Sequence, residues 1–149
     1  MLRSTFDRFL SAAGLVLAVL LLVVSGLAFW GFSFANGTVR DQLSAQRITM
    51  PTEQAMTGLS DADKAALLPF AGQPLDNGDA ARAYADHYIQ AHMNAASGGK
   101  TYSEVSGACT AAKKADPQMQ QEATQTVCEL RETLFMGDTL RSILLTAYA

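Results

Sequence analysis

The chain has 149 residues, of which 49% are hydrophobic and 17% are charged, and its formal net charge is −3. That length suits a single domain. An acidic balance argues against nucleic-acid binding, which needs a basic patch. Two cysteines and two histidines leave no room for a zinc finger or a disulfide-dense scaffold.

The apolar residues gather near the N-terminus. No charged residue lies between Phe9 and Val39, and 21 of the 27 residues in Phe9–Ala35 are apolar. A helix needs about 20 apolar residues to cross the hydrocarbon core of a lipid bilayer. The pattern therefore predicts a transmembrane helix over 10–34, preceded by a short tail at 1–9. The alternative is a cleaved signal peptide, but this apolar run exceeds the roughly 7–15 residues of a signal-peptide core.

Two groups of residues in this helix are candidates for function. Aromatic residues at its far end are expected at the lipid–water boundary; they are Phe29, Trp30, Phe32 and Phe34. Small residues allow a neighbouring helix to approach closely, although they are also simply common in membrane helices. They are Gly14, Ala18, Ser25 and Gly26.

The positive charges do not decide the orientation of the helix. Arg3 and Arg8 flank one end, and Arg40 and Arg47 flank the other. A nine-residue tail is easily left in the cytoplasm, and a pair of cysteines in the rest of the chain suits an oxidising compartment. We therefore expect a plasma-membrane protein with a cytoplasmic N-terminus and an extracytoplasmic (periplasmic) domain.

The remaining residues, 36–149, indicate an all-α fold. They include 20 alanines but only three valines and three isoleucines. Alanine favours helices, whereas strands are rich in β-branched residues. We expect a juxtamembrane helix and linker over 35–59 and a small helical domain over 60–149.

Local signals predict where these helices begin and end. Asn36-Gly37 is expected to end or kink the membrane helix, and Met50–Leu59 has the composition of a loop. Ser60 is expected to be a helix N-cap, and Gly98-Gly99 is expected to end a helix. Thr101 with Glu104 matches a capping box.

Further helices follow along the chain. Asp79–Ala96 has the clearest helical period. Asp116-Pro117 resembles an N-cap followed by proline at the first helical position, so a helix is expected to start there. Gly137-Asp138 is expected to break that helix, with a last helix starting near Thr139. The apolar end, Leu140–Ala149, has two explanations: it docks back on the core or membrane surface, or the chain leads into a second membrane helix.

The sequence contains no complete catalytic or metal-binding motif, so we predict no enzyme activity and no cofactor or metal. His87 and His92 are five residues apart, which separates them by about 140° around a helix. Helical zinc pairs use a spacing of four residues. No nucleophile motif, phosphate-binding loop, Cys-x-x-Cys or haem attachment motif is present.

Cys109 and Cys128 are the pair with the clearest structural use. A disulfide closing a loop of this size stabilises by roughly 3 kcal/mol in the chain-entropy model. A helix start at Asp116-Pro117 would offset the two residues along an antiparallel hairpin by on the order of 9 Å. The disulfide therefore requires crossed helices or a longer link, and two free buried thiols are the alternative.

Three aromatic residues are candidate anchors for a partner: Phe70, Tyr84 and Tyr88. Aromatic side chains dominate the energetics of interfaces. The alternative for the two tyrosines is that they fill a core that has few large apolar residues. Phe70 is the stronger candidate because it follows Pro69 in a turn-rich segment.

Several segments resemble a family of small actinobacterial membrane proteins. These are Val39–Gln46, Pro69–Leu75, Ala83–Ile89, Gly98–Tyr102 and Leu134–Ala149. The resemblance implies a membrane helix at each end. It also implies a role like that of the mycobacterial respiratory supercomplex association factors, which are accessory subunits of the cytochrome bcc–aa3 oxidase supercomplex in the respiratory chain (electron transport). The expected partners are subunits of such a membrane complex and the lipid bilayer, with no nucleic acid. A stand-alone, membrane-anchored module that binds a small ligand or a cell-envelope partner is the alternative function.

Overall fold

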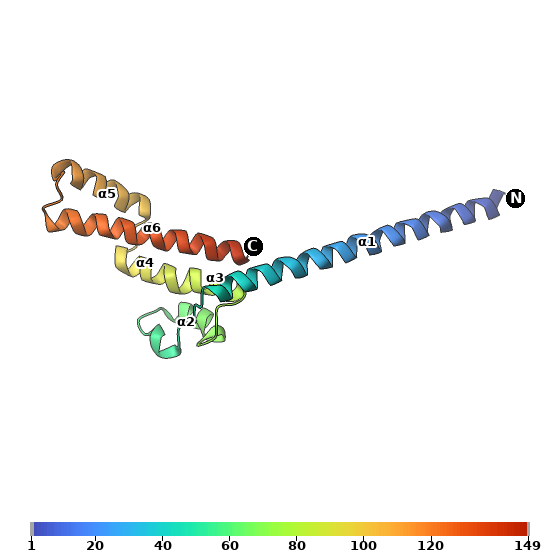
Figure 1. Cartoon of the computed structure of the whole chain (residues 1–149), viewed down its shortest axis with the longest axis horizontal. Helices are drawn as coiled ribbons and strands as arrows, with labels where there is room; N and C mark the ends of the chain where they lie inside the picture. The colour runs from blue at the N-terminus through green and yellow to red at the C-terminus, as the bar shows by residue number, and fades with distance from the viewer. Residues whose placement is uncertain (1, 149) are drawn as a thin grey trace. The chain divides into compact units, whose positions relative to one another are not determined.

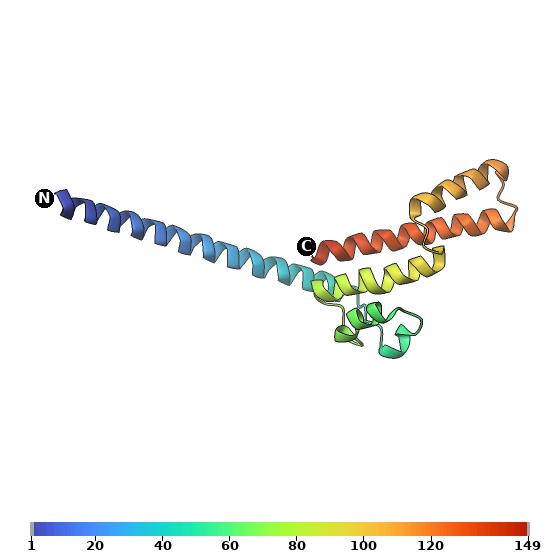
Figure 2. The same ribbon diagram turned by 180° about the vertical axis from the view of Figure 1, so that it is seen from behind.

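A computed structural model of the chain describes residues 2–148, and every regular element in that range is helical (Figures 1 and 2). The predicted all-α class is confirmed for these residues. The chain divides into two compact units, Met1–Thr38 and Val39–Ala149. We call the second unit the helical domain.

Helix α1 runs unbroken from Leu2 to Ala45. The helix end expected at Asn36-Gly37 does not occur. One glycine costs a helix only about 1 kcal/mol, which the flanking apolar turns outweigh. The Thr38 hydroxyl donates to the Phe34 carbonyl oxygen at 3.0 Å within this stretch. The helix ends after Ala45, where Arg47 takes a left-handed conformation with φ of 52°.

The segment expected to be a plain loop, Met50–Leu59, contributes to the core instead. It holds a 3₁₀ turn, η1 (Glu53–Met56), and both Met50 and Met56 are only 1% exposed. Two backbone hydrogen bonds of 2.9 Å join the start of this segment to residues 73–75. They run from Met50 N–H to the Gln73 carbonyl and from Leu75 N–H to the Ile48 carbonyl. Buried methionines give this segment a fixed place that its polar composition does not suggest.

Helix α2 (Asp61–Leu67) begins where the sequence predicts. The Ser60 hydroxyl accepts the backbone N–H of Asp63, which confirms the predicted N-cap. A 3₁₀ turn, η2 (Leu68–Phe70), follows with Pro69 inside it.

The predicted helix over Asp79–Ala96 is present but is not uniform. It consists of α3 (Gly78–Ala83), a π-helical segment η3 (Tyr84–Ile89) and α4 (Gln90–Ser97). It ends at Gly98, whose φ of 63° is the left-handed conformation of a typical helix stop. The π segment widens one turn, so residues on either side of it do not follow a single helical period.

Helices α5 (Tyr102–Ala115) and α6 (Glu122–Tyr148) form an antiparallel pair and lie side by side in both views (Figures 1 and 2). The capping box of Thr101 and Glu104 is confirmed at the start of α5. The helix start predicted at Asp116-Pro117 is wrong. The Asp116 carboxylate instead accepts the N–H groups of Gln120 and Gln121, at 3.1 and 2.8 Å, and shapes a loop before α6.

The break predicted at Gly137-Asp138 is also wrong, because α6 continues through it. Gly137 is buried there. A β-carbon at this position would lie only 2.4 Å from the sulfur of Met93. The glycine therefore allows α4 and α6 to pack closely and does not end a helix.

The helical domain contains two apolar clusters. The main core contains ten buried residues: Leu43, Met50, Met56, Leu67, Leu75, Ala80, Ala81, Ala83, Ala85 and Leu144. A small cluster of Met93, Val105 and Leu134 lies between α4, α5 and α6. None of the domain's six aromatic residues is among the buried ones. Methionine, leucine and alanine thus form the core, and the aromatic rings cover its margins.

Candidate functional site

The two cysteines form the predicted disulfide. The sulfurs of Cys109 and Cys128 lie 1.99 Å apart, and their Cα atoms lie 4.9 Å apart. The expected offset disappears because the link between the helices is longer than the sequence indicated. Cys109 is six residues before the end of α5, and Cys128 is six residues after the start of α6. Equal distances from the loop place the two residues opposite each other.

The candidate residues of α1 are uncovered within the part of the chain that the structure describes. The aromatic residues Phe29, Trp30, Phe32 and Phe34 are all exposed, and the rings of Trp30 and Phe34 stack with centroids 5.9 Å apart. A β-carbon built on Gly14 or Gly26 meets no atom within 4 Å. Ala18 and Ser25 are also exposed. The position of the aromatic residues at a lipid boundary, and the use of the small residues for helix packing, therefore stay predictions.

The three candidate anchors in the helical domain are half-buried. Phe70, Tyr84 and Tyr88 all pack against the main core. The rings of Tyr84 and Tyr88 stack with centroids 5.0 Å apart, and burial raises the pKa of Tyr84. Part of each ring therefore belongs to the core, and the rest stays accessible to a partner.

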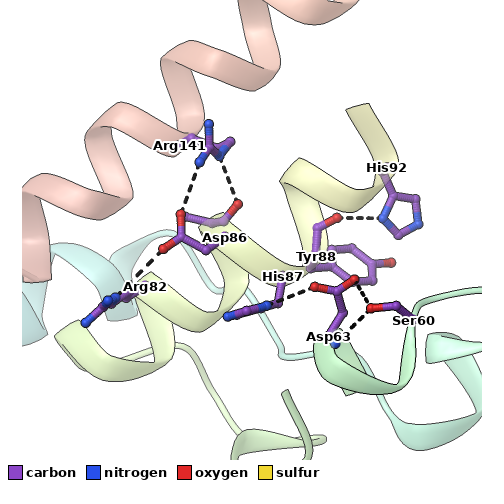
Figure 3. Close-up of polar contacts among 9 residues, drawn as sticks. Ser60, Asp63, Arg82, Asp86, His87, Tyr88, His92 and Arg141 are labelled. Atoms are coloured by element: carbon purple, nitrogen blue, oxygen red, sulfur yellow. Dashed lines mark hydrogen bonds and ion pairs between the residues drawn. The ribbon is translucent and has the colours of Figure 1, made fainter. Parts of the chain in front are cut away.

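The π-helical segment carries a cluster of polar side chains on both of its sides (Figure 3). On one side, Arg141 of α6 donates from Nε to the Ala85 carbonyl at 3.0 Å and from Nη2 to the Asp86 carboxylate at 3.1 Å. Arg82 lies 3.8 Å from the other oxygen of Asp86. Arg141 thus holds the widened turn against α6.

On the other side, His87 is bound to α2. Its Nδ1 lies 2.9 Å from Oδ1 of Asp63, and the Ser60 hydroxyl donates to Oδ2 of the same carboxylate at 2.5 Å (Figure 3). The Ser60 hydrogen bond and His87 lower the pKa of Asp63. In a hydrolase triad the serine bonds to the histidine. Here Ser60 bonds to the carboxylate, so the contact caps a helix and does not activate a nucleophile.

The two histidines of η3 and α4 do not share a site. Nδ1 of His92 bonds to the Tyr88 carbonyl at 2.7 Å, whereas His87 bonds to Asp63. Among residues 2–148, no group of three or more His, Cys, Asp or Glu side chains is arranged to hold a metal ion. The sequence did not indicate the Asp63–His87 contact, because the two residues lie 24 positions apart.

A polar groove of about 240 Å³ lies between α4, the start of α5 and α6. Its lining includes Lys100 and Arg141 as cations and Asp138 as an anion. The other lining residues are Gln90, Met93, Asn94, Gly99, Thr101, Tyr102 and Leu134. The volume is below the roughly 300–1,000 Å³ of typical small-molecule sites.

The outer face of α6 holds exposed large apolar residues. Met136, Leu140 and Ile143 are 58%, 52% and 62% exposed. Leu144, one helical turn beyond Leu140, is buried in the main core. The apolar end of the chain therefore does dock on the core, as one of the two predicted explanations has it, but only along one side. In the sequence, only the helical spacing of Met136, Leu140 and Ile143 indicates that these three residues lie near one another on α6.

Comparison of this chain with protein-family models, curated proteins and solved structures finds no match. Its function has to be inferred from the chemistry of its own surfaces.

Proposed function

We propose that this protein is a membrane-anchored, non-catalytic accessory or assembly subunit of a larger membrane complex. The observation that carries the proposal is the exposure of α1. Its apolar segment has no cover from the rest of the described chain, and its length and composition suit a membrane span. Water-exposed apolar side chains cost about 1.5–3 kcal/mol each relative to burial, so a run of this length needs lipid or protein around it.

The proposed location is the plasma membrane, with the N-terminus in the cytoplasm and the helical domain outside. A disulfide between Cys109 and Cys128 supports this orientation, because such bonds persist in oxidising compartments. The aromatic residues Phe29–Phe34 would then lie at the outer lipid boundary.

The proposed mode of action is contact. Exposed large apolar residues gather on α6. In the Ser60–Asp63–His87 contact the serine bonds to the carboxylate and not to the histidine, which is the arrangement of a helix cap. The family resemblance points to a respiratory-chain complex, and we propose subunits of a cytochrome bcc–aa3 oxidase supercomplex as the partners. Helix packing along α1 and contacts of the outer domain would hold the protein there.

The experiment is native electrophoresis of membranes solubilised in a mild detergent. We expect the protein to migrate with a large complex whose band carries b-, c- and a-type haem spectra. Migration as a free monomer under conditions that keep that complex intact would contradict the proposal. Co-migration with a large complex that lacks haem would keep the accessory role and remove the respiratory assignment.

The polar groove supports the second candidate, a stand-alone module that binds a small polar ligand. Lys100, Arg141 and Asp138 provide charges of both signs around it. This reading predicts a monomer in mild detergent and a thermal midpoint that rises when a small zwitterion such as an amino acid is added. The small volume of the groove makes it the weaker candidate.

A further inference from the structure

Helix α6 presents one continuous seam of exposed residues with two different characters. Met136, Leu140 and Ile143 follow one another at intervals of four and three residues, so they share a face. All three are more than half exposed. They form the apolar half of the seam.

The same face continues toward the start of α6 as an acidic half. Glu122, Glu129, Met136 and Ile143 are each seven residues apart, and a helix turns only about 20° off line per seven residues. Both glutamates are exposed. We define the α6 seam as Glu122, Glu129, Met136, Leu140 and Ile143.

The charges of the seam argue against a lipid surface as its occupant. An amphipathic helix that lies on a membrane usually has Lys and Arg on its polar side, which attract anionic headgroups. The seam carries two glutamates, and residues 39–149 hold 9 Lys and Arg against 13 Asp and Glu. An anionic membrane surface would repel such a domain.

The pattern also argues against a second copy of the chain. A parallel pair would place glutamates opposite glutamates, and an antiparallel pair would place them opposite Met136 and Ile143. Both arrangements are unfavourable, because like charges repel and a buried charge needs a partner.

We propose that the α6 seam binds a helical segment of a partner protein that is apolar along one half and carries Lys or Arg along the other half. Apolar side chains of that segment pack on Met136, Leu140 and Ile143. Its cations face Glu122 and Glu129, which fixes the direction of docking. This proposal rests on the accessory role proposed above and names the surface and the chemistry of the partner.

The experiment places a photo-crosslinking amino acid at Ile143 of the full-length protein in its native membranes. A matched control carries it at Thr110, which is exposed on α5. We expect Ile143, but not Thr110, to form an adduct with another polypeptide. Mass spectrometry should locate the adduct in a segment with apolar residues at helical spacing and Lys or Arg about two to four turns away, which is the spacing of Glu129 and Glu122 from Met136.

Charge reversal then tests the acidic half. Glu122→Lys combined with Glu129→Lys should lower the adduct yield by on the order of tenfold, because the new lysines would then face the cations of the partner segment. The control pair Glu53→Lys and Asp61→Lys makes the same change in net charge on exposed residues outside α6 and should leave the yield unchanged. Circular dichroism checks that helix content is equal in the two labelled proteins and the two charge-reversed variants.

Several outcomes would overturn the proposal. These are an adduct with lipid, an adduct with a second copy, no adduct at Ile143, an acidic partner segment, or a yield that the reversed charges do not change. Native electrophoresis separates this failure from failure of the accessory role. A protein that still migrates with a large complex keeps that role even if the α6 seam is not its contact.

Discussion

The side chain of Arg141 joins α6 to the π-helical segment through two charge-assisted hydrogen bonds. It donates to the Ala85 carbonyl and to Asp86, and it is only 22% exposed. Bonds to charged groups contribute about 1.5–3 kcal/mol each when partly buried. We expect Arg141→Ala to lower the free energy of unfolding by at least about 3 kcal/mol, measured by denaturant titration with circular dichroism in detergent.

Arg40→Ala is the matched control for this change. Arg40 pairs with Asp76 at 2.9 Å, a similar distance, but its side chain is 70% exposed. Exposed pairs contribute about 0–1 kcal/mol, since water and salt screen them. Equal losses in the two variants would mean that the contact with Ala85 adds nothing.

Asp63 gives the helical domain a predictable response to acid. The Ser60 hydroxyl and His87 hold its pKa below the ordinary value of 3.8. A group with a lowered pKa in the folded state stabilises that state at higher pH and loses the contribution as pH falls through the folded pKa. We expect Asp63→Asn to be less stable than the wild type at pH 5, with the difference shrinking below pH 3.8.

The measurement is the free energy of unfolding of both proteins at several pH values between about 5 and 2.5. A difference that is constant across this range would show that the carboxylate gains nothing from Ser60 and His87.

At the scale of the helices, the features that the sequence predicted correctly are those formed by residues close together in the chain. The caps at Ser60 and Thr101 involve residues three positions apart, so their sequence signal is complete. The π segment is different, because Arg141 contacts the Ala85 carbonyl from 56 residues away. At Asp116 the sequence offered an N-cap, but the carboxylate bonds to Gln120 and Gln121 in a loop. The π segment was missed because its contact comes from a distant part of the chain, and the loop was missed because backbone N–H groups four and five residues on compete for the Asp116 carboxylate.

Gly137 and Gly107 form a matched pair for testing close packing of helices. Both lie inside helices, and a β-carbon at Gly107 meets no atom within 4 Å, whereas one at Gly137 meets the Met93 sulfur at 2.4 Å. Alanine favours a helix over glycine by about 1 kcal/mol. We therefore expect Gly107→Ala to stabilise by about that amount and Gly137→Ala to destabilise, since overpacking costs about 1–3 kcal/mol.

Thermal and denaturant unfolding measure both changes. Adding Met93→Leu to Gly137→Ala alters the side chain that the new methyl group meets, so the two substitutions should not be additive. Stabilisation by both glycine variants would mean that Met93 moves aside at no cost and that α4 and α6 do not need the glycine.

At the scale of the whole molecule, the features easiest to predict from the sequence are those that depend on a concentrated or rare residue type. The apolar run of α1 follows from residue types alone. The disulfide between Cys109 and Cys128 was one of two alternatives that the sequence left open, and the longer link between α5 and α6 makes it possible. The α6 seam does not follow from residue types, because its apolar residues share a sequence segment with Leu144, which is buried. Only the packed domain separates the side of α6 that supplies the core from the side left open. The proposed contact surface is therefore a property of the fold and not of the segment.

The orientation of the chain in the membrane is the prediction with the widest consequence, since it decides which partners the domain can meet. Arg40, Asp41 and Arg47 follow the aromatic residues that are expected at the outer lipid boundary, and Ser44 is exposed among them. With both native cysteines in the disulfide, Ser44→Cys introduces a single reactive thiol. We expect a membrane-impermeant maleimide to label it in intact cells. Ser4→Cys, in the tail before the apolar run, should react only after lysis. The reverse pattern would place the helical domain in the cytoplasm, where it could not contact extracytoplasmic parts of a complex and the disulfide would not persist.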